Sequence, residues 1–179
     1  MSYRPNPPTP RQIQTLKISP GERGIDETVG LMTDLIRAGS MWPYLRPLAL
    51  KIVTGCPERD FECMAEKVFQ FVQMNMKFVN DNYGVETLQT VPHMIEAMHG
   101  GVAHGDCDDF TILIGALLKS LGFQTKIRVL KFIGGNNFSH VMLVANLRGG
   151  GWREFDGSVR SGETSGAIRR EQKDYPIIQ

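Results

Sequence analysis

Residues 105–122 read Gly-Asp-Cys-Asp-Asp-Phe-Thr-Ile-Leu-Ile-Gly-Ala-Leu-Leu-Lys-Ser-Leu-Gly, and this stretch decides the fold. Asp106 is a favoured helix N-cap and Gly122 a favoured C-terminal cap, so the pattern predicts a helix between them. The helix is apolar on almost every side, and a helix without a polar face has to be buried. We therefore expect a central helix that begins at Cys107 and is covered by the rest of the chain.

The chain before this stretch is predicted to be helical. Apolar residues recur three and four positions apart, with Asp60 and Thr90 as N-caps and Gly39 as a helix end. The expected helices cover residues 26–39, 43–55, 60–72 and 91–99.

After Gly122 the pattern changes to extended runs rich in Thr, Ile, Val and Phe. Three strands are expected, at Phe123 to Ile133, Phe138 to Leu147 and Trp152 to Asp156, with Gly-rich and Asn-rich turns between them. Helices followed by a strand meander predict an α+β domain in which the buried helix packs on an antiparallel sheet.

The two ends of the chain differ from this middle part. Five prolines within residues 1–24 predict an extended N-terminal arm, which is either a loose tail or a segment that orders against a partner. The folded domain is expected over residues 25–160, followed by an exposed polar C-terminal tail over residues 161–179.

Composition limits the possible partners and location. The 179 residues are 41% hydrophobic and carry a net charge of +1, so no bulk charge indicates binding to nucleic acid or a membrane surface. No stretch suits a signal peptide or a membrane span, and an odd number of cysteines suits free thiols in a reducing compartment, although one pair could bridge. We expect a soluble, cytoplasmic protein in which Cys56 and Cys63 are packing residues.

Cys107 is the candidate nucleophile. At the first position of a helix, unpaired N–H groups and the helix dipole favour a thiolate. Asp108 and Asp109 stand beside the sulfur and oppose a second negative charge. These two acids either complement the positive end of the helix or receive a cationic group of a substrate.

A thiol nucleophile usually needs an imidazole base and a group that orients the imidazole. His140 lies in the second predicted strand, on the same face as Met142 and Val144, and we expect this face to point toward the central helix. If the second and third strands pair with an even register sum such as 296 or 298, His140 and Asp156 share a face. Cys107, His140 and Asp156 then form a candidate triad.

The segment from Gly105 to Asp109, Ser139-His140-Val141 on a strand, and the run from Trp152 to Gly157 together resemble the transglutaminase-like superfamily of papain-like fold. The upstream segment from Lys77 to Asp81, followed by residues 86–89, is similar to the stretch before the cysteine in its small bacterial and bacteriophage members. The likeness covers roughly residues 24–159.

The resemblance implies acyl transfer through a thioester, with Cys107 as nucleophile, His140 as base and Asp156 as orienting carboxylate. It implies a protein or peptide substrate, a peptidase or amidase rather than a calcium-dependent transglutaminase, and a phage or prophage origin in the host cytoplasm. The Cys107 N–H is one candidate oxyanion donor and the Gln89 side chain a weaker one. Neither a cofactor nor a metal is expected.

Two other interpretations stay open. The first is a non-enzymatic structural protein, for example a virion component, whose arm and tail contact other phage structural proteins. The second is a metal site that includes His99, His104 and Cys107, although their spacing suits no tetrahedral zinc pattern. Hydrolysis and transamidation are not distinguished by these residues.

Overall fold

A computed structural model describes residues 18–80, 87–135, 137–159 and 169–178. Most of the N-terminal arm and residues 161–168 of the predicted tail lie outside this part. Its elements are α1 Glu22–Met41, α2 Leu45–Ile52, α3 Phe61–Asn75, β1 Met76–Phe78, α4 Val91–His99, β2 Ala103–Gly105, α5 Cys107–Ser120, β3 Thr125–Phe132, β4 His140–Asn146, the short 3₁₀ helix η1 Arg148–Gly150, β5 Trp152–Phe155 and β6 Arg169–Pro176.

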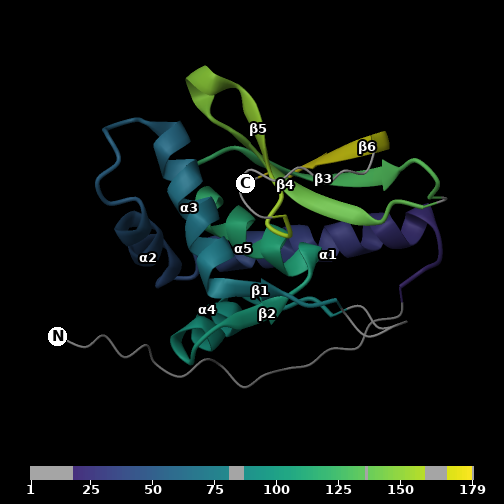
Figure 1. Cartoon of the computed structure of the whole chain (residues 1–179), viewed down its shortest axis with the longest axis horizontal. Coiled ribbons are helices and arrows are strands. Elements are labelled where there is room, and N and C mark those ends of the chain that lie inside the picture. Colours follow the sequence, from purple (N-terminus) through teal and green to yellow (C-terminus); the bar gives the residue numbers. More distant parts are fainter. Residues whose placement is uncertain (1–17, 81–86, 136, 160–168, 179) are drawn as a thin grey trace.

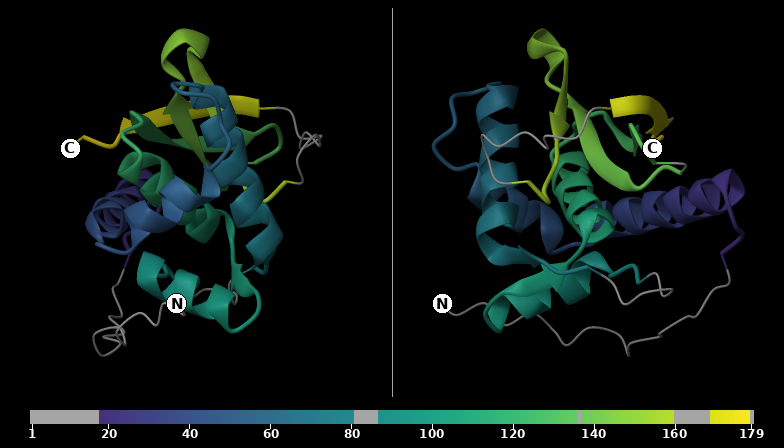
Figure 2. Two further views of the ribbon diagram at one scale, coloured as in Figure 1. Left: turned by 90° about the vertical axis from the view of Figure 1, so that its left-hand side faces the viewer. Right: turned by 45° about the vertical axis from the view of Figure 1, so that its right-hand side comes forward.

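The central helix is α5, as the sequence predicts. Every residue from Asp108 to Leu118 is buried, and α5 contacts all four other α-helices as well as β2, β3 and β4. Gly122 follows the helix with a φ of 87°, a left-handed conformation that glycine adopts without strain. Figures 1 and 2 show the four-stranded sheet on one side of α5, with α4 and the β1–β2 pair on the other.

The predicted helices form, with one change at α1. Asp60 caps α3 and Thr90 caps α4 through their side chains, as expected. The first helix, however, starts at Glu22 and continues past Gly39, which is buried inside it. A Cβ at Gly39 would lie 2.4 Å from a methyl carbon of Val91, so this glycine allows α1 to approach α4 closely and does not end the helix.

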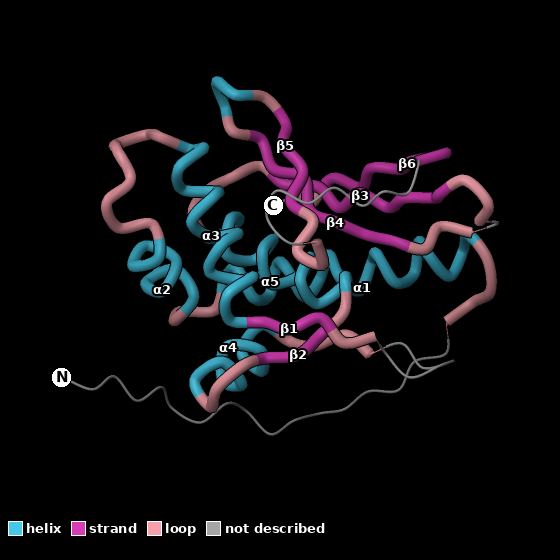
Figure 3. The backbone as a smooth tube through the Cα atoms, in the orientation of Figure 1, coloured by secondary structure: helices cyan, strands magenta, loops and turns pink. Residues whose placement is uncertain are grey.

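The sheet has the strand order β5-β4-β3-β6, which Figure 3 shows in magenta. The hairpin of β4 and β5 pairs Leu143 with Phe155 and Val144 with Glu154, a register sum of 298. The register is therefore even, which is the condition for His140 and Asp156 to share a face. A separate parallel pair, β1 with β2, was not predicted, because three-residue strands leave little periodic signal.

The last part of the segment after residue 160 is exposed over residues 169–173, as expected, but it is a strand and not a tail. Residues 169–176 form β6, which pairs antiparallel with β3 over most of its length. The polar sequence is explained by an ion-pair network in which Arg128 bonds to both Asp174 and Glu154. Lys126 also lies 2.6 Å from Asp174, so charges replace an apolar face on this strand.

The sheet packs on α5 with the face opposite to the one that carries the Arg128 ion pairs. Val141, Leu143 and Ala145 belong to the core cluster, and the side chain of Leu143 would lie 3.1 Å from a Cβ on Gly115 of α5. His140, Met142 and Val144 therefore do not face the central helix as expected. Their face carries the charges of the Arg128 network instead.

The prediction that Cys56 and Cys63 are free packing residues is wrong as well. The two sulfurs form a disulfide between residues seven apart, which joins the loop after α2 to the first turn of α3. Cys107 is the free cysteine of the described residues. No helix in the described ranges combines the length and apolar content that a bilayer crossing requires.

The ion pairs of Asp174 predict a loss of stability in acid. The hydrogen bond from Arg128, followed by that from Lys126, lowers the pKa of Asp174 to about 2 against burial, which raises it. Because the pKa is lower in the folded state, the stabilisation is present above pH ~4 and lost as pH falls toward 2. We expect Asp174→Asn to lower the free energy of unfolding at pH 7 and to flatten its fall between pH 4 and 2.

Urea denaturation at pH 2, 3, 4 and 7 measures this effect. Asp34→Asn on the exposed side of α1 is the matched control and should behave like the unmodified protein. Parallel stability curves for the unmodified and Asp174→Asn proteins across this range would contradict the assignment.

Candidate active site

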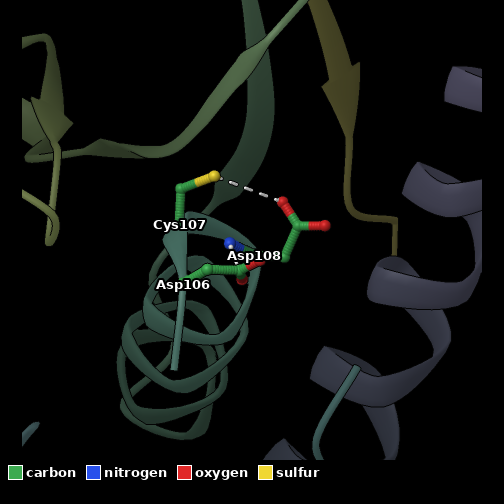
Figure 4. A group of neighbouring side chains, drawn as sticks. All are labelled: Asp106, Cys107 and Asp108. Carbon is green, nitrogen blue, oxygen red and sulfur yellow. Dashed lines mark hydrogen bonds between the residues drawn. The ribbon is translucent and has the colours of Figure 1, made fainter. Parts of the chain in front are cut away.

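Cys107 lies where the sequence places it, at the first position of α5. The side chain of Asp106 caps this helix by accepting the N–H of Asp108 at 3.0 Å. The sulfur lies 3.6 Å from Oδ1 of Asp108, the contact drawn in Figure 4. The backbone N–H of Val141 is close enough to the sulfur to favour the thiolate and so to lower the pKa of Cys107. The thiol is therefore in contact with β4 at the residue that follows His140.

The position of Val141 explains this contact. The described pairing of β4 with β5 starts at Leu143, so the N–H of Val141 lies beyond the end of the β5 ladder. In an antiparallel ladder, residues 141, 143 and 145 direct their backbone groups to the same side. The N–H of Val141 is therefore directed away from β3, to the side on which β5 pairs with β4.

His140 and Asp156 are brought together as the even register requires. Nε2 of His140 lies 2.7 Å from Oδ2 of Asp156, and both side chains are largely buried. Burial raises the pKa of Asp156, but hydrogen bonds from His140 and Ser158 outweigh it, so the pKa of this carboxyl is lowered. The carboxylate is thus charged at neutral pH and accepts the hydrogen of Nε2, which fixes the orientation of the imidazole ring.

The electrostatics at the thiol oppose its ionisation. Burial raises the pKa of the Cys107 thiol, the carboxylates of Asp108 and Asp106 raise it further, and the N–H of Val141 only partly offsets them. The favourable end of the helix dipole does not prevail here, because burial and two neighbouring negative charges both oppose the thiolate. In this arrangement Cys107 is a thiol that is hydrogen-bonded to Asp108.

Asp109 has a structural role that sequence reasoning did not identify. Its buried carboxylate accepts the Gln89 N–H at 2.9 Å on one oxygen and the Gln89 side-chain amide at 2.6 Å on the other. The same amide donates to the carbonyl of His104 at 2.7 Å. Both N–H bonds of this amide are occupied, so the structure does not support Gln89 as an oxyanion donor, nor Asp109 as a receptor for a cationic substrate.

Two glycines let these parts approach one another. A Cβ on Gly105 would lie 2.5 Å from Oδ2 of Asp109, and a Cβ on Gly157 would lie 2.5 Å from the ring of Phe110 on α5. Gly105 therefore makes room for the buried carboxylate, and Gly157 lets the turn after Asp156 rest on the cysteine helix. The glycines beside the predicted site residues are explained by packing.

The donor atoms of Asp106, Cys107 and Asp108 lie within 4.8 Å of one another, which makes them the metal-type cluster of the described residues. It differs from the set considered from the sequence, because His99 ends α4 and His104 lies in β2. Asp106 already caps α5 and Asp108 contacts the thiol, so both acids have roles without an ion.

A pocket of about 600 Å³ lies elsewhere, along the β4–β5 hairpin. Its lining residues are Glu62, Arg128, Val144, Leu147, Gly150, Trp152, Arg153 and Glu154. None of the three predicted site residues lines this pocket, so the pocket and the candidate site are separate features.

The close contact at Gly157 predicts that a methyl group there is not tolerated. Gly157→Ala should lower the free energy of unfolding by about 1–3 kcal/mol, because the new Cβ overlaps the Phe110 ring and forces the turn or α5 to move. Chemical denaturation measures the change. Gly149→Ala, where no atom lies within 4 Å of the new Cβ, is the control and should stay within about 0.5 kcal/mol. Equal stability of both variants would contradict the packing account.

The carboxylate next to the sulfur predicts a second effect. Because Asp108 raises the pKa of Cys107, Asp108→Asn should lower this pKa and speed alkylation by iodoacetamide at pH 7.5. Each unit of decrease increases the thiolate fraction about tenfold below the pKa.

Cys107 can be labelled selectively while the Cys56–Cys63 disulfide is kept intact, and the labelling rate from pH 6 to 10 gives the titration curve. Asp34→Asn provides the same chemical change on the exposed side of α1. A labelling rate for Asp108→Asn that equals the rate of this control would show that Asp108 does not set the ionisation of the thiol.

No protein-family model matches the sequence, and no curated protein does either. Two solved structures share the fold. One is named a "putative protease" from Parabacteroides distasonis, with a TM-score of 0.54, 8% identity, and coverage of 72% of this chain and 26% of that one. The other is named a "putative cysteine protease" from Cytophaga hutchinsonii, with a TM-score of 0.50, 16% identity, and coverage of 87% and 50%.

These two similarities establish an α+β fold shared with proteins named as proteases. The chain spans about a quarter of the first protein and half of the second.

Proposed function

We propose that this protein is a cysteine-dependent acyl-transfer enzyme, a peptidase or amidase, with Cys107 as nucleophile, His140 as base and Asp156 as orienting carboxylate. The observation that carries the proposal is the 2.7 Å hydrogen bond between His140 and Asp156. His140 is followed along β4 by Val141, whose backbone N–H lowers the pKa of the Cys107 thiol. The fold shared with two proteins named as proteases supports it.

The proposed reaction starts from a neutral thiol. The face of β4 that carries His140 points away from α5, so the reaction requires a movement that brings the thiol and the imidazole together. Nδ1 of the imidazole then takes the proton of the thiol, and the sulfur attacks the acyl carbon of the substrate. The imidazolium, stabilised by Asp156, returns the proton to the leaving amine as the carbon–nitrogen bond breaks, which leaves a thioester on Cys107. Water then attacks the thioester with His140 again as base, and releases the acid and the free thiol.

The raised pKa of Cys107 has a consequence for this mechanism. An enzyme with a preformed thiolate–imidazolium pair would react quickly with any alkylating agent. Here the proton has to leave during the attack, so the rate depends on His140 as a general base. The backbone N–H of Cys107 is the proposed donor to the developing oxyanion.

The substrate class in this proposal is a protein or peptide, and the setting is a phage or prophage protein made in a host cytoplasm. This part rests on the resemblance of the motifs alone. The Cys56–Cys63 disulfide bears on the location, since disulfides persist mainly outside reducing compartments. Release from the cytoplasm, for example as part of a virion, would accommodate the disulfide.

A second candidate function is a non-enzymatic structural protein that retains this fold. The hydrogen bond from the thiol to Asp108 favours it, because a carboxylate beside a nucleophile suppresses the thiolate. In that case the arm and the C-terminal part contact other phage structural proteins, and Cys107 is chemically silent.

Acylation by p-nitrophenyl acetate separates the two functions. We expect an acetyl thioester at Cys107, detected by peptide mass spectrometry, together with release of p-nitrophenol. His140→Ala should slow this acylation by roughly 10²-fold, the usual contribution of a positioned general base. His99→Ala at the end of α4 is the matched control and should leave the rate unchanged.

Acylation that proceeds equally well in His140→Ala would overturn the triad. Absence of acylation in the unmodified protein would favour the structural function. Addition of an amine such as glycine methyl ester to the acylated protein then distinguishes transfer to amines from hydrolysis.

A further inference from the structure

Asp156 lies just beyond the end of β5, so the strand ladder does not hold it. The last described pair of the hairpin is Leu143 with Phe155. A local turn replaces the ladder, in which the N–H of Val159 donates to the carbonyl of Asp156 at 3.3 Å. The orientation of the Asp156 carboxylate therefore depends on contacts within this turn.

Ser158 makes those contacts. Its hydroxyl donates to Oδ1 of Asp156 at 2.7 Å and its backbone N–H donates to the same oxygen at 3.2 Å. The other oxygen, Oδ2, faces Nε2 of His140 at 2.7 Å. Because a carboxylate is planar and rigid, holding Oδ1 in place also determines where Oδ2 lies.

The turn that carries Ser158 is itself held by two helices. Gly157 packs directly against Phe110 of α5, and the carbonyl of Val159 accepts a hydrogen bond from the side chain of Gln73 on α3. Ser158 therefore lies between two anchored residues, and its hydroxyl acts from a defined position.

We propose that Ser158 is a positioning residue for the reaction: its hydroxyl fixes the Asp156 carboxylate so that Oδ2 orients the imidazole of His140. This inference rests on the proposed function and extends it to a residue that touches neither the substrate nor the thiol. The hydroxyl is the part that matters, because any residue except proline at this position would retain the backbone N–H.

A double-mutant cycle tests the proposal, with acylation of Cys107 by p-nitrophenyl acetate as the measurement. Ser158→Ala should slow acylation about tenfold, the effect expected for one lost hydrogen bond to a charged group, and Ser158→Thr should retain the rate. In a His140→Ala background, Ser158→Ala should have no further effect, because its influence passes through His140. Ser40→Ala, which removes a hydroxyl bonded within α1, is the matched control.

The outcomes separate this inference from the function on which it rests. Equal slowing by Ser158→Ala in both backgrounds, or no slowing at all, would overturn the positioning role while the triad stands. Acylation independent of His140 would overturn both. If circular dichroism shows that Ser158→Ala is unfolded, the comparison of Ser158→Thr with Ser158→Val repeats the test. These two side chains have the same shape, and a methyl group in Val replaces the hydroxyl of Thr.

Discussion

The burial of α5 is the constraint on which the rest of the structure depends. Contact between an apolar surface and water is unfavourable, so a helix that is apolar all round is stable only when other elements pack on every side of it. The other α-helices and the four-stranded sheet supply it. This arrangement places the N-terminus of α5 at the end of β4, where Cys107 meets Val141. The position of the candidate nucleophile therefore follows from core packing.

Much of the polar sequence around Cys107 serves the same packing. The Gln89 amide and backbone satisfy the buried Asp109 carboxylate, and Gly105 leaves room for it. An unpaired carboxylate there would be costly, so Gln89 and Asp109 act as a unit that ties the segment before α4 to the cysteine helix. The catalytic or binding roles that the motif suggests for Gln89 and Asp109 are therefore not needed to explain these residues, because both are required to bury the start of α5.

The candidate site combines one arrangement suited to catalysis with one that opposes it. The bond between Asp156 and His140 orients an imidazole that the proposed function uses as a base, whereas burial and the carboxylates of Asp108 and Asp106 raise the pKa of the Cys107 thiol. The two are compatible only if proton transfer accompanies attack. An enzyme with a neutral resting thiol and a structural protein that keeps the fold therefore differ in whether His140 can remove the proton of Cys107 against burial and these two carboxylates.

The sequence by itself determined the elements whose signals are local: the buried helix with its two caps and the capped helices α3 and α4. The even hairpin register that joins His140 to Asp156 was one of two alternatives, and the structure decided it. Only the tertiary structure decided which sheet face meets α5, that residues 169–176 add a strand, and that Cys56 reaches Cys63. The alternation of side chains along a strand does not show which of its two faces is turned toward the core. The charged sequence of β6 is typical of an exposed tail, and only the pairing of Asp174 with Arg128 explains it as a strand. Local sequence patterns reflect interactions between residues that are close in the sequence. The sheet face that packs on α5, the added strand and the disulfide depend on residues that are distant in the chain or on the path of a loop.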